Sequence, residues 1–385
     1  MRLLQVHNFY RQPGGEDQIF AAEHNLLRAH GHRVSQYTAH NDSVAEVSAA
    51  SLAARTIWNP SAYREIQTLI QRESIELVHV HNTFPIVSPA VYYAARAEGV
   101  PVVQTLHNYR LLCPAATFFR EGTVCERCLG RAVPYPALVH RCYRRSAGAS
   151  LATAAMLTGH RAAGTWRTKI DAYIALSDFA KNKFAEGGLP ARRIMVKPGF
   201  VEDPGYGNGT GGYALFLGRL TEEKGVTVLY EAWKRLGSVL PLKIAGDGPL
   251  RPVLHDLPGV EYLGQCSRTR VMELLKQAAF LVVPSLWYEG FPMVVVEALA
   301  CGTPVVASAL GSLNELIEDG VNGFRFAPGD AGALVSCVES GLRSESFLQM
   351  RGRARACYEQ NYTPRRNYDI LMQIYSAAAR QDQSL

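Results

Sequence analysis

Two glutamates, Glu289 and Glu297, stand eight positions apart in a segment that also holds a glycine, a proline and a run of valines. A strand-like stretch, residues 280–285, precedes them, and an apolar helical stretch, residues 294–300, follows. Pro292 suits the first helical position, where a missing N–H costs nothing. The segment therefore predicts a strand, a glycine turn and a helix N-terminus, which present backbone N–H groups and a positive dipole end to an anion.

The two carboxylates are predicted to lie on opposite sides of that anion. Glu289 falls in the turn, and Glu297 falls about one and a half turns inside the helix by the 3.6-residue period. Glu289 could bond sugar hydroxyls or stabilise an oxocarbenium-like centre, and Glu297 could accept bonds from a ribose diol. A nucleotide-sugar has this layout of sugar, diphosphate and ribose. The alternative for Glu297 is a buried carboxylate that ties two helices together. The backbone expected to hold the diphosphate and the sugar belongs to Gly290, Phe291, Pro292 and Met293.

Two cations, Arg219 and Lys224, follow another predicted strand and are separated by a short acidic turn. The guanidinium fork and the ammonium point charge could neutralise a diphosphate leaving group, on which negative charge develops as it departs. The alternative is a surface ion-pair cluster with Glu222 and Glu223.

Other candidates follow strands of the first half. The Gly14-Gly15 turn precedes a predicted helix, so its backbone could approach a phosphate, or it could be an ordinary loop. His107 ends the strand of residues 102–106, where active-site residues of open α/β sheets lie, and its alternative is a core or capping histidine. His79 and His81 are weaker candidates for the acceptor side.

Four cysteines, Cys113, Cys125, Cys128 and Cys142, form an array with one C-x2-C pair. Such a set can hold a structural zinc ion, but the outer spacings are unlike those of a zinc ribbon, so free thiols are the favoured interpretation. The sequence lacks an Asp-x-Asp pair, so a catalytic divalent metal bound through such a motif is not indicated.

Short apolar strands alternate with helices in both halves of the chain. Helices are expected at residues 16–29 and 90–97, because glycines follow their ends. This alternation predicts two parallel sheets with helices on both faces. The predicted strands are residues 3–6, 77–80, 102–106, 172–176, 213–217, 242–245, 260–263, 280–283 and 304–307.

The length of 385 residues favours two domains. The boundary is expected near residue 200, because residues 197–199 and the glycine-rich stretch 204–212 resemble a linker. We therefore expect domains at residues 1–200 and 201–363. Residues 364–380 read as a C-terminal helix.

The net charge of +6 is concentrated in the first half, where residues 1–200 hold 23 basic and 14 acidic residues. Residues 127–170 hold eight Lys and Arg and no acidic residue. This basic stretch, which also has aromatic residues, indicates contact with an anionic membrane or acceptor, and its alternative is a solvated basic face. No nucleic-acid module is recognisable, so nucleic acid is not an expected partner. No membrane-spanning run or signal peptide is evident either, so a cytoplasmic location is expected, at most at the inner face of the membrane.

Four elements in order resemble the retaining glycosyltransferases of glycosyltransferase family 4, and Glu289 and Glu297 match that family's E-x7-E motif. The resemblance implies a GT-B fold, which has two Rossmann-like domains and an interdomain cleft. It also implies a UDP- or GDP-sugar donor held partly by the Gly246 loop, a glycan or lipid-linked acceptor on the N-terminal domain, and a C-terminal helix that crosses back to that domain. The four elements are residues 216–225, 244–249, 289–297 and 300–307.

Under this resemblance the expected function is retaining sugar transfer in cell-surface or exopolysaccharide assembly, with catalytic roles for Glu289, His107, Arg219 and Lys224. The family often has an Asp after the His that faces the donor sugar, whereas this chain has Asn108. Two alternatives remain: a nucleotide-sugar epimerase or hydrolase on the same fold, and a non-catalytic nucleotide-sugar-binding subunit.

Overall fold

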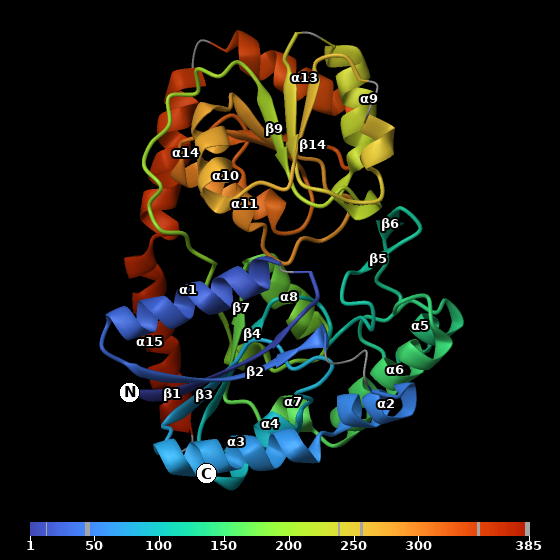
Figure 1. The fold of residues 1–385 in the computed structure, drawn as a ribbon, viewed down its shortest axis with the longest axis vertical. Coiled ribbons are helices and arrows are strands. Elements are labelled where there is room, and N and C mark those ends of the chain that lie inside the picture. The colour runs from blue at the N-terminus through green and yellow to red at the C-terminus, as the bar shows by residue number, and fades with distance from the viewer. Residues whose placement is uncertain (13, 43–46, 238, 255–256, 345–346, 382–385) are drawn as a thin grey trace. The chain divides into compact units, whose positions relative to one another are not determined.

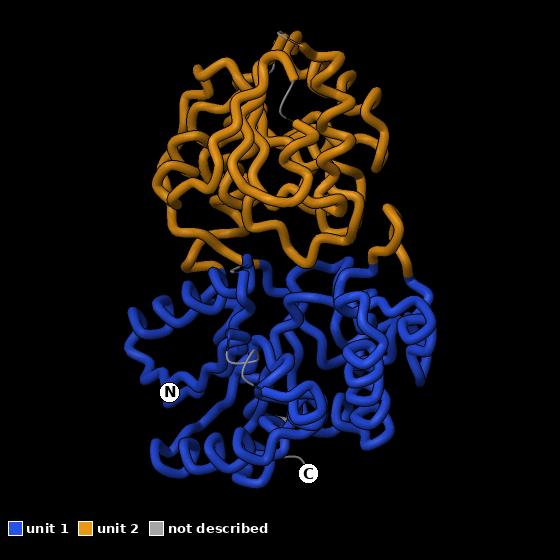
Figure 2. The backbone as a smooth tube through the Cα atoms, turned by 45° about the vertical axis from the view of Figure 1, so that its right-hand side comes forward, with its two compact units in different colours: residues 1–118, 126–198, 367–385 blue, residues 119–125, 199–366 orange. Residues whose placement is uncertain are grey.

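The chain forms two compact units, which Figure 2 shows in different colours. The computed structural model describes residues 1–12, 14–42, 47–237, 239–254, 257–344 and 347–381. Unit 1 comprises Met1–Phe118, Glu126–Pro198 and the C-terminal segment from Asn367, and unit 2 comprises Phe119–Cys125 and Gly199–Arg366. Among the described residues, no helix combines the length and the apolar character that a membrane span requires.

Unit 1 is built on a sheet of six strands, each parallel to its neighbours. The central strands are buried from end to end, as expected for a parallel sheet covered on both faces. In spatial order the strands are β2 (Arg33–His40), β1 (Arg2–Phe9), β3 (Leu77–Val80), β4 (Val102–Leu106), β7 (Ala172–Ala175) and β8 (Ile194–Val196).

The helices of unit 1 include two pairs that pack side by side, α2 with α6 and α3 with α4 (Figure 1). Helix α15 (Pro364–Gln381) contributes the fully buried side chains of Leu371, Ile374 and Tyr375 to unit 1. The other helices are α1 (Gly15–Ala29), α2 (Ala49–Ile57), α3 (Pro60–Glu73), α4 (Ala90–Ala97), α5 (Tyr135–Val139), α6 (Ala147–Ala162), α7 (Thr165–Thr168), α8 (Asp178–Glu186) and the short η2 (Ala191–Arg193).

Unit 2 repeats the architecture with a second parallel six-stranded sheet. The prediction of two parallel sheets flanked by helices is thereby confirmed. In spatial order the strands are β11 (Val260–Gly264), β10 (Leu242–Ala245), β9 (Ala214–Leu217), β12 (Phe280–Val283), β13 (Val305–Ser308) and β14 (Gly323–Phe326). A small antiparallel hairpin, β5 (Phe119–Arg120) and β6 (Thr123–Val124), also clusters with this unit.

Helices cover both faces of the second sheet. Figure 1 shows α9 beside α13 on one side and α10, α11 and α14 together on the other. Trp233 of α9 is fully buried in the core, where its Nε1 donates to the Leu240 carbonyl at 2.9 Å. The helices are α9 (Val226–Leu236), α10 (Arg268–Gln277), α11 (Met293–Ala300), α12 (Leu313–Leu316), α13 (Ala331–Arg343) and α14 (Phe347–Asn361), with short η3 (Glu222–Lys224) and η4 (Arg251–Leu254).

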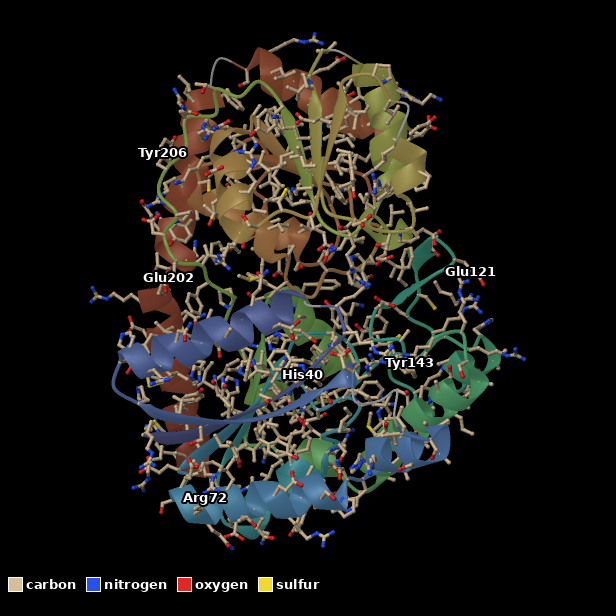
Figure 3. The ribbon with its side chains drawn as sticks, in the orientation of Figure 1. His40, Arg72, Glu121, Tyr143, Glu202 and Tyr206 are labelled. Carbon is tan, nitrogen blue, oxygen red and sulfur yellow. The ribbon has the colours of Figure 1, made fainter. Side chains whose placement is uncertain are left out.

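The two units separate between Pro198 and Gly199, within the first part of the expected linker, whereas its glycine-rich part, residues 204–212, is packed onto unit 2. The N–H of Gly207 donates to the Cys301 carbonyl at 2.9 Å, and that of Gly209 donates to the Lys276 carbonyl at 3.0 Å. Tyr206, labelled in Figure 3, lies on this stretch, with the guanidinium of Arg351 from α14 over its ring. Glycines occur here because the backbone approaches its neighbours closely, and flexibility is not the reason.

Candidate active site

The candidate site of unit 2 lies where strands β9 and β12 are neighbours. The chain leaves β9 toward β10 and leaves β12 toward β13, so the connections diverge at this point. Parallel α/β sheets bind ligands at such a point, outside the carboxyl ends of the strands. Arg219 and Lys224 follow β9, and Ser285 and Glu289 follow β12.

Lys224 and Glu289 form an ion pair that joins these two loops. The Lys224 Nζ donates to the Oε1 and Oε2 of Glu289 at 2.8 and 3.0 Å. The Ser285 hydroxyl donates to the same Oε1 at 2.6 Å, and the Ser312 hydroxyl donates to the Glu289 carbonyl at 2.9 Å. Three hydrogen bonds thus fix the carboxylate, and a fourth fixes the backbone of the same residue.

The environment keeps Glu289 ionised although the residue is only 5% exposed. Burial alone would raise the pKa of this carboxyl. The positive charge of Lys224 and hydrogen bonds from Lys224 and Ser285 outweigh burial, so the pKa lies below its ordinary value of 4.5. The Lys224 side chain is 22% exposed, so the pair is open to a ligand on one side.

Glycines allow the loops of this site to touch. A Cβ at Gly225, whose φ is +72°, would lie 1.8 Å from the Pro284 carbonyl oxygen. A Cβ at Gly246, whose φ is +143°, would lie 1.9 Å from the Gly218 carbonyl oxygen. Any larger residue would push the loops after β9, β10 and β12 apart, so these glycines hold Lys224 within reach of Glu289.

Helix α11 begins at Met293, so Pro292 is its N-cap rather than its first residue, one position from the prediction. In its first turn the N–H of Val295 donates to the Pro292 carbonyl at 2.9 Å, while those of Met293 and Val294 come before the first intrahelical bond and lie a few positions after Gly290. Phe291 and Met293 are buried, which anchors this turn while Gly290 stays half-buried. The predicted helix N-terminus next to Glu289 is therefore present.

Glu297, on α11, is a buried carboxylate of a different kind. It is 5% exposed, and among the described residues its side chain has no hydrogen-bond or ion-pair partner. Burial raises its pKa to about 7, with Arg268 acting weakly in the opposite direction. A buried acceptor without donors is what a ligand diol would satisfy. Within the described part of the chain, this side chain makes no hydrogen bond that would tie two helices together.

Arg219 lies at the surface of unit 2. Its side chain is 53% exposed and its Nη2 lies 3.4 Å from the Glu223 Oε1. The surface ion pair weighed as an alternative is thus formed with one of the two glutamates. An exposed pair of this kind is weak, so the guanidinium can exchange Glu223 for a ligand phosphate at little cost.

In unit 1, His107 at the end of β4 is buried and uncharged. Its Nε2 lies 3.0 Å from the Nδ1 of His81, and its Nδ1 is buried without a partner among the described residues. Burial lowers the pKa of both imidazoles well below 6.5, and the neighbouring cationic groups lower it further. The ring of His107 is therefore available as a neutral hydrogen-bonding group, and no imidazolium is expected.

The histidines adjoin a buried ion pair, Glu23 and Lys197, that the sequence reasoning missed. The Lys197 Nζ lies 2.5 Å from the Glu23 Oε1, and both side chains are completely buried. A signal existed: Glu23 interrupts the apolar stripe of α1 at a position that faces the core.

Glu23, His79 and His81 place possible metal-ligand atoms within 4.8 Å of one another. Part of the group is engaged, because the Glu23 Oε1 pairs with Lys197 and both ring nitrogens of His79 bond hydroxyls, those of Tyr375 and Thr105, at 2.8 Å. The Glu23 Oε2 and the His81 Nε2 lie 3.7 Å apart and are buried without a hydrogen-bond partner among the described residues. Because both nitrogens of His79 are already bonded, we assign the group to the core of unit 1.

The Gly14-Gly15 turn is exposed at the N-terminus of α1. The Gly14 N–H donates to the Asp17 Oδ2 at 2.7 Å, so this donor already has an internal anion. Asn108, which replaces the expected aspartate, donates to the Glu16 Oε2 at 3.2 Å. Burial and the nearby Asp17 charge raise the pKa of Glu16 to about 8.

None of the four clustered cysteines forms a disulfide among the described residues. In the described part of the chain, Glu23, His79 and His81 are the only group of three or more potential ligands brought together, so the structure does not assemble a zinc site from Cys113, Cys125, Cys128 and Cys142.

Comparison with known proteins links this geometry to one class of enzymes. Residues 207–360 match the family "Glycosyl transferases group 1", and residues 21–203 match "Glycosyltransferase Family 4". An uncharacterized glycosyltransferase of Methanocaldococcus jannaschii is 36% identical over 274 residues, which are 68% of this chain and 64% of that protein. The phosphatidyl-myo-inositol mannosyltransferase of Mycolicibacterium smegmatis is 26% identical over 85% of this chain and 82% of that protein.

The chain spans less than two thirds of the first relatives it matches: 64% of the M. jannaschii protein and 42% of the Mycobacterium tuberculosis glycogen synthase. Among solved structures, Anabaena HepE in complex with UDP and glucose superposes with a TM-score of 0.67 at 18% identity over 100% of both chains. The sucrose-phosphate synthase of Thermosynechococcus elongatus superposes with a TM-score of 0.71 at 16% identity over 98% of both. At these identities the likeness establishes the fold.

Proposed function

We propose that the chain is a GT-B glycosyltransferase, because residues 21–203 and 207–360 match two glycosyltransferase families. In this proposal it moves a sugar from a nucleoside-diphosphate sugar to a hydroxyl of a glycan or lipid-linked acceptor, with retention of the anomeric configuration. The observation that carries this proposal is the ion pair of Lys224 and Glu289 beside the N-terminus of α11. It combines a cation for a leaving diphosphate with a fixed, ionised carboxylate for a sugar.

In the proposed complex the donor diphosphate lies against the first turn of α11. Lys224 uses two N–H groups on Glu289 and keeps a third for a phosphate oxygen. Arg219 leaves Glu223 to contact the same group, and the Gly246 loop lies next to it. Glu297 accepts the ribose hydroxyls, which supplies the donors that its buried carboxylate lacks.

The proposed chemistry breaks the bond between the anomeric carbon and the diphosphate oxygen, and the electron pair leaves with the diphosphate. The acceptor oxygen attacks on the same face, and its proton passes to the departing phosphate oxygen. Glu289 bonds the sugar hydroxyls and stabilises the positive charge at the anomeric carbon. Lys224, Arg219 and the helix N-terminus supply the neutralising charge, so the proposal requires no catalytic divalent metal.

A UDP-sugar is the first donor to test, since HepE, which shares this fold, was solved in complex with UDP, and a GDP-sugar is the second. Unit 1 would hold the acceptor, with neutral His107 as a hydrogen-bonding group and the Gly14-Gly15 turn as a further backbone contact. The basic stretch 127–170 suits an acceptor or membrane that carries negative charge, as in cell-surface or exopolysaccharide assembly.

A panel of nucleotide-sugars, assayed for released nucleotide with and without acceptor, tests the proposal. Release that depends on acceptor is expected. Equal release without acceptor would indicate a hydrolase, interconversion of the donor an epimerase, and binding without turnover a non-catalytic subunit. NMR of the first-formed product should show the anomeric configuration of the donor, and an inverted linkage would refute the proposed stereochemistry.

A further inference from the structure

Unit 1 contains a cavity of about 290 Å³ that none of the roles above uses. It lies between the loop after β4, the start of the basic stretch, the turn from α6 to α7 and the end of α8. The side chains that matter for its chemistry are Leu111, Leu112, Arg131, Arg161, Trp166 and Arg167.

The cavity wall carries positive charge without compensation. In the part of the chain that the structure describes, none of Arg131, Arg161 and Arg167 pairs with a carboxylate. Arg161 donates to backbone carbonyls alone, those of Arg131 and Leu111 at 2.6 Å and that of Ala132 at 3.4 Å. Burial lowers its pKa, so its charge is held at a cost that a bound anion would reduce.

The acidic residues that flank this region in the chain are occupied elsewhere. Lys183 pairs with Glu126 at 2.9 Å and with Glu186 at 3.0 Å. Residues 127–170 themselves contain no Asp or Glu. The described part of the chain thus places no carboxylate in an ion pair with any of the three arginines.

Trp166 adds an unsatisfied donor. The residue is 4% exposed, and its Nε1 has no acceptor among the described residues. An indole nitrogen can only donate, so it needs an acceptor atom to offset its burial. An oxyanion in the cavity would supply acceptors on the side that Trp166 lines.

Exposed apolar side chains adjoin the cavity on the basic stretch. Val133 is 46% exposed and follows the lining residue Ala132, and Tyr135 is 51% exposed with the Arg131 guanidinium 5.0 Å from its ring centre. Val139, on α5 like Tyr135, is 70% exposed. Apolar groups next to a cationic cavity match an amphiphile, in which a hydrocarbon tail is joined to an anionic head.

We propose that this cavity binds the phosphate group of a lipid, with Arg131, Arg161, Arg167 and Trp166 around the head and Val133 and Tyr135 against the hydrocarbon. The identification of this lipid with a lipid-linked acceptor rests on the proposed function, whereas the binding itself does not.

Co-sedimentation with vesicles of phosphatidylcholine, with and without phosphatidic acid, tests the cavity against general charge. The double variant Arg131→Gln/Arg167→Gln removes two cavity charges. The matched control Arg144→Asn/Arg145→Asn removes two charges from the loop around Tyr143, labelled in Figure 3, which does not line the cavity. Asn tolerates the positive φ of Arg144 and Arg145.

The cavity pair should lose about tenfold more affinity for the anionic vesicles than the control pair, the size expected for charge-assisted hydrogen bonds. Equal losses of vesicle affinity in the two double variants would show that the basic stretch acts by diffuse charge, and would refute a specific site in the cavity. Both variants should keep the melting temperature and the UDP affinity of the parent. If only the cavity variant melts at a lower temperature, its loss of affinity could reflect misfolding. The fluorescence experiment below, which uses neither variant, then decides.

Fluorescence of Trp166 gives that readout. Short-chain phosphatidic acid should change the emission saturably in the parent and leave it unchanged in Trp166→Phe, while glycerol 3-phosphate should need about tenfold higher concentration because it lacks the tail. A response of the parent that Trp166→Phe retains, or no response in the parent, would refute binding in this cavity. Equal affinity for glycerol 3-phosphate would refute the proposal that the ligand is a lipid. A chain that shows this response but transfers no sugar would refute the proposed function and leave the cavity standing.

Discussion

The two units share one architecture but use buried charge differently. In unit 1, Glu23 and Lys197 are completely buried and are surrounded by neutral histidines. In unit 2, Lys224 is 22% exposed and holds Glu289 ionised at the carboxyl ends of the strands. The comparison separates charge that holds a fold together from charge that remains available to a ligand.

The strand orders do not explain this difference, because the connections diverge in both sheets. In unit 2 they diverge between β9 and β12, and in unit 1 between β1, which leads to β2, and β3, which leads to β4. The side chains after the strands differ instead: His81 and His107 in unit 1 bond each other and are buried, whereas Lys224 in unit 2 bonds Glu289 and stays 22% exposed. Paired polar groups at strand ends therefore predict a ligand site only when one partner is still accessible.

The largest expected effect is on the stability of unit 1. Lys197→Ala leaves the Glu23 charge buried and unpaired, which should lower the free energy of unfolding of unit 1 by about 3–5 kcal/mol. Native-state hydrogen exchange of the β1 amides measures this, because exchange reports each unit separately. The double variant Glu23→Leu/Lys197→Met should lose less than Lys197→Ala. If Lys197→Ala is as stable as the parent, the ion pair of Glu23 and Lys197 contributes nothing to the stability of the fold.

The two units should respond to pH with opposite sign between about pH 6.5 and 5. The pKa of His79 falls from 6.5 to about 3 on folding, and those of His81 and His107 fall likewise, so acid favours unfolding of unit 1 by roughly 1.4 kcal/mol per pH unit for each histidine. Glu16, with its pKa raised to about 8, opposes this trend. The pKa values of His24, His32 and His160 are lowered as well, so the histidines of unit 1 outnumber this carboxyl.

In unit 2 the pKa of Glu297 rises from 4.5 to about 7 on folding, so the folded state binds its proton more tightly. Unit 2 should therefore gain stability as the pH falls through this window. Exchange of β3 amides compared with β12 amides at pH 5 and pH 6.5 measures both slopes. Parallel slopes would contradict the assignment of neutral histidines to one unit and a protonated carboxyl to the other.

Glu297→Gln should make unit 2 more stable and weaken its binding of nucleotide. Removing the buried carboxyl should stabilise ligand-free unit 2 at pH 8, while the loss of a charged acceptor for the ribose should weaken nucleotide binding about tenfold. Calorimetric titration with UDP measures the affinity. If the UDP affinity of the parent changes with pH near pH 7, that change should be absent in Glu297→Gln and present in His107→Asn. An unchanged affinity for UDP would show that Glu297 does not contact the nucleotide.

The smallest effect is expected at Arg219. Its exposed pair with Glu223 contributes at most about 1 kcal/mol to stability, so Arg219→Ala should melt like the parent. The turnover of donor should nevertheless fall, because one cation near the diphosphate is lost. Arg235→Ala, on α9 of the same unit, is the control for loss of a surface charge. Equal turnover in both variants would show that Arg219 is a solvated surface residue without a role in transfer.

Much of the fold could be predicted because central strands are unbroken apolar runs. β3, β4, β10 and β12 have the predicted bounds. β2 was missed because it is a partly exposed edge strand, and a polar sequence such as Arg33–His40 lacks an apolar run. The glycine-rich stretch was misread because close packing and flexibility demand the same residue.

The candidate site divides in the same way. The segment from Glu289 to Glu297 was recognisable because strand, turn and helix signals lie within a few positions of each other. The pairing of Glu289 with Lys224 joins residues 65 positions apart, and that of Glu23 with Lys197 joins residues 174 apart. Such contacts depend on which strand ends meet, and local patterns carry no information about that.

The central claim is that the Glu289 carboxylate, fixed by Lys224, serves sugar transfer rather than the fold. The most direct measurement is kcat for donor turnover in Glu289→Gln, together with its affinity for UDP and its melting temperature. The amide keeps the shape but loses the charge, so kcat should fall at least ~100-fold, the scale for one preorganised electrostatic group, while UDP affinity and melting temperature stay close to the parent's. Near-normal kcat, or a loss of activity matched by a loss of folding, would contradict the account.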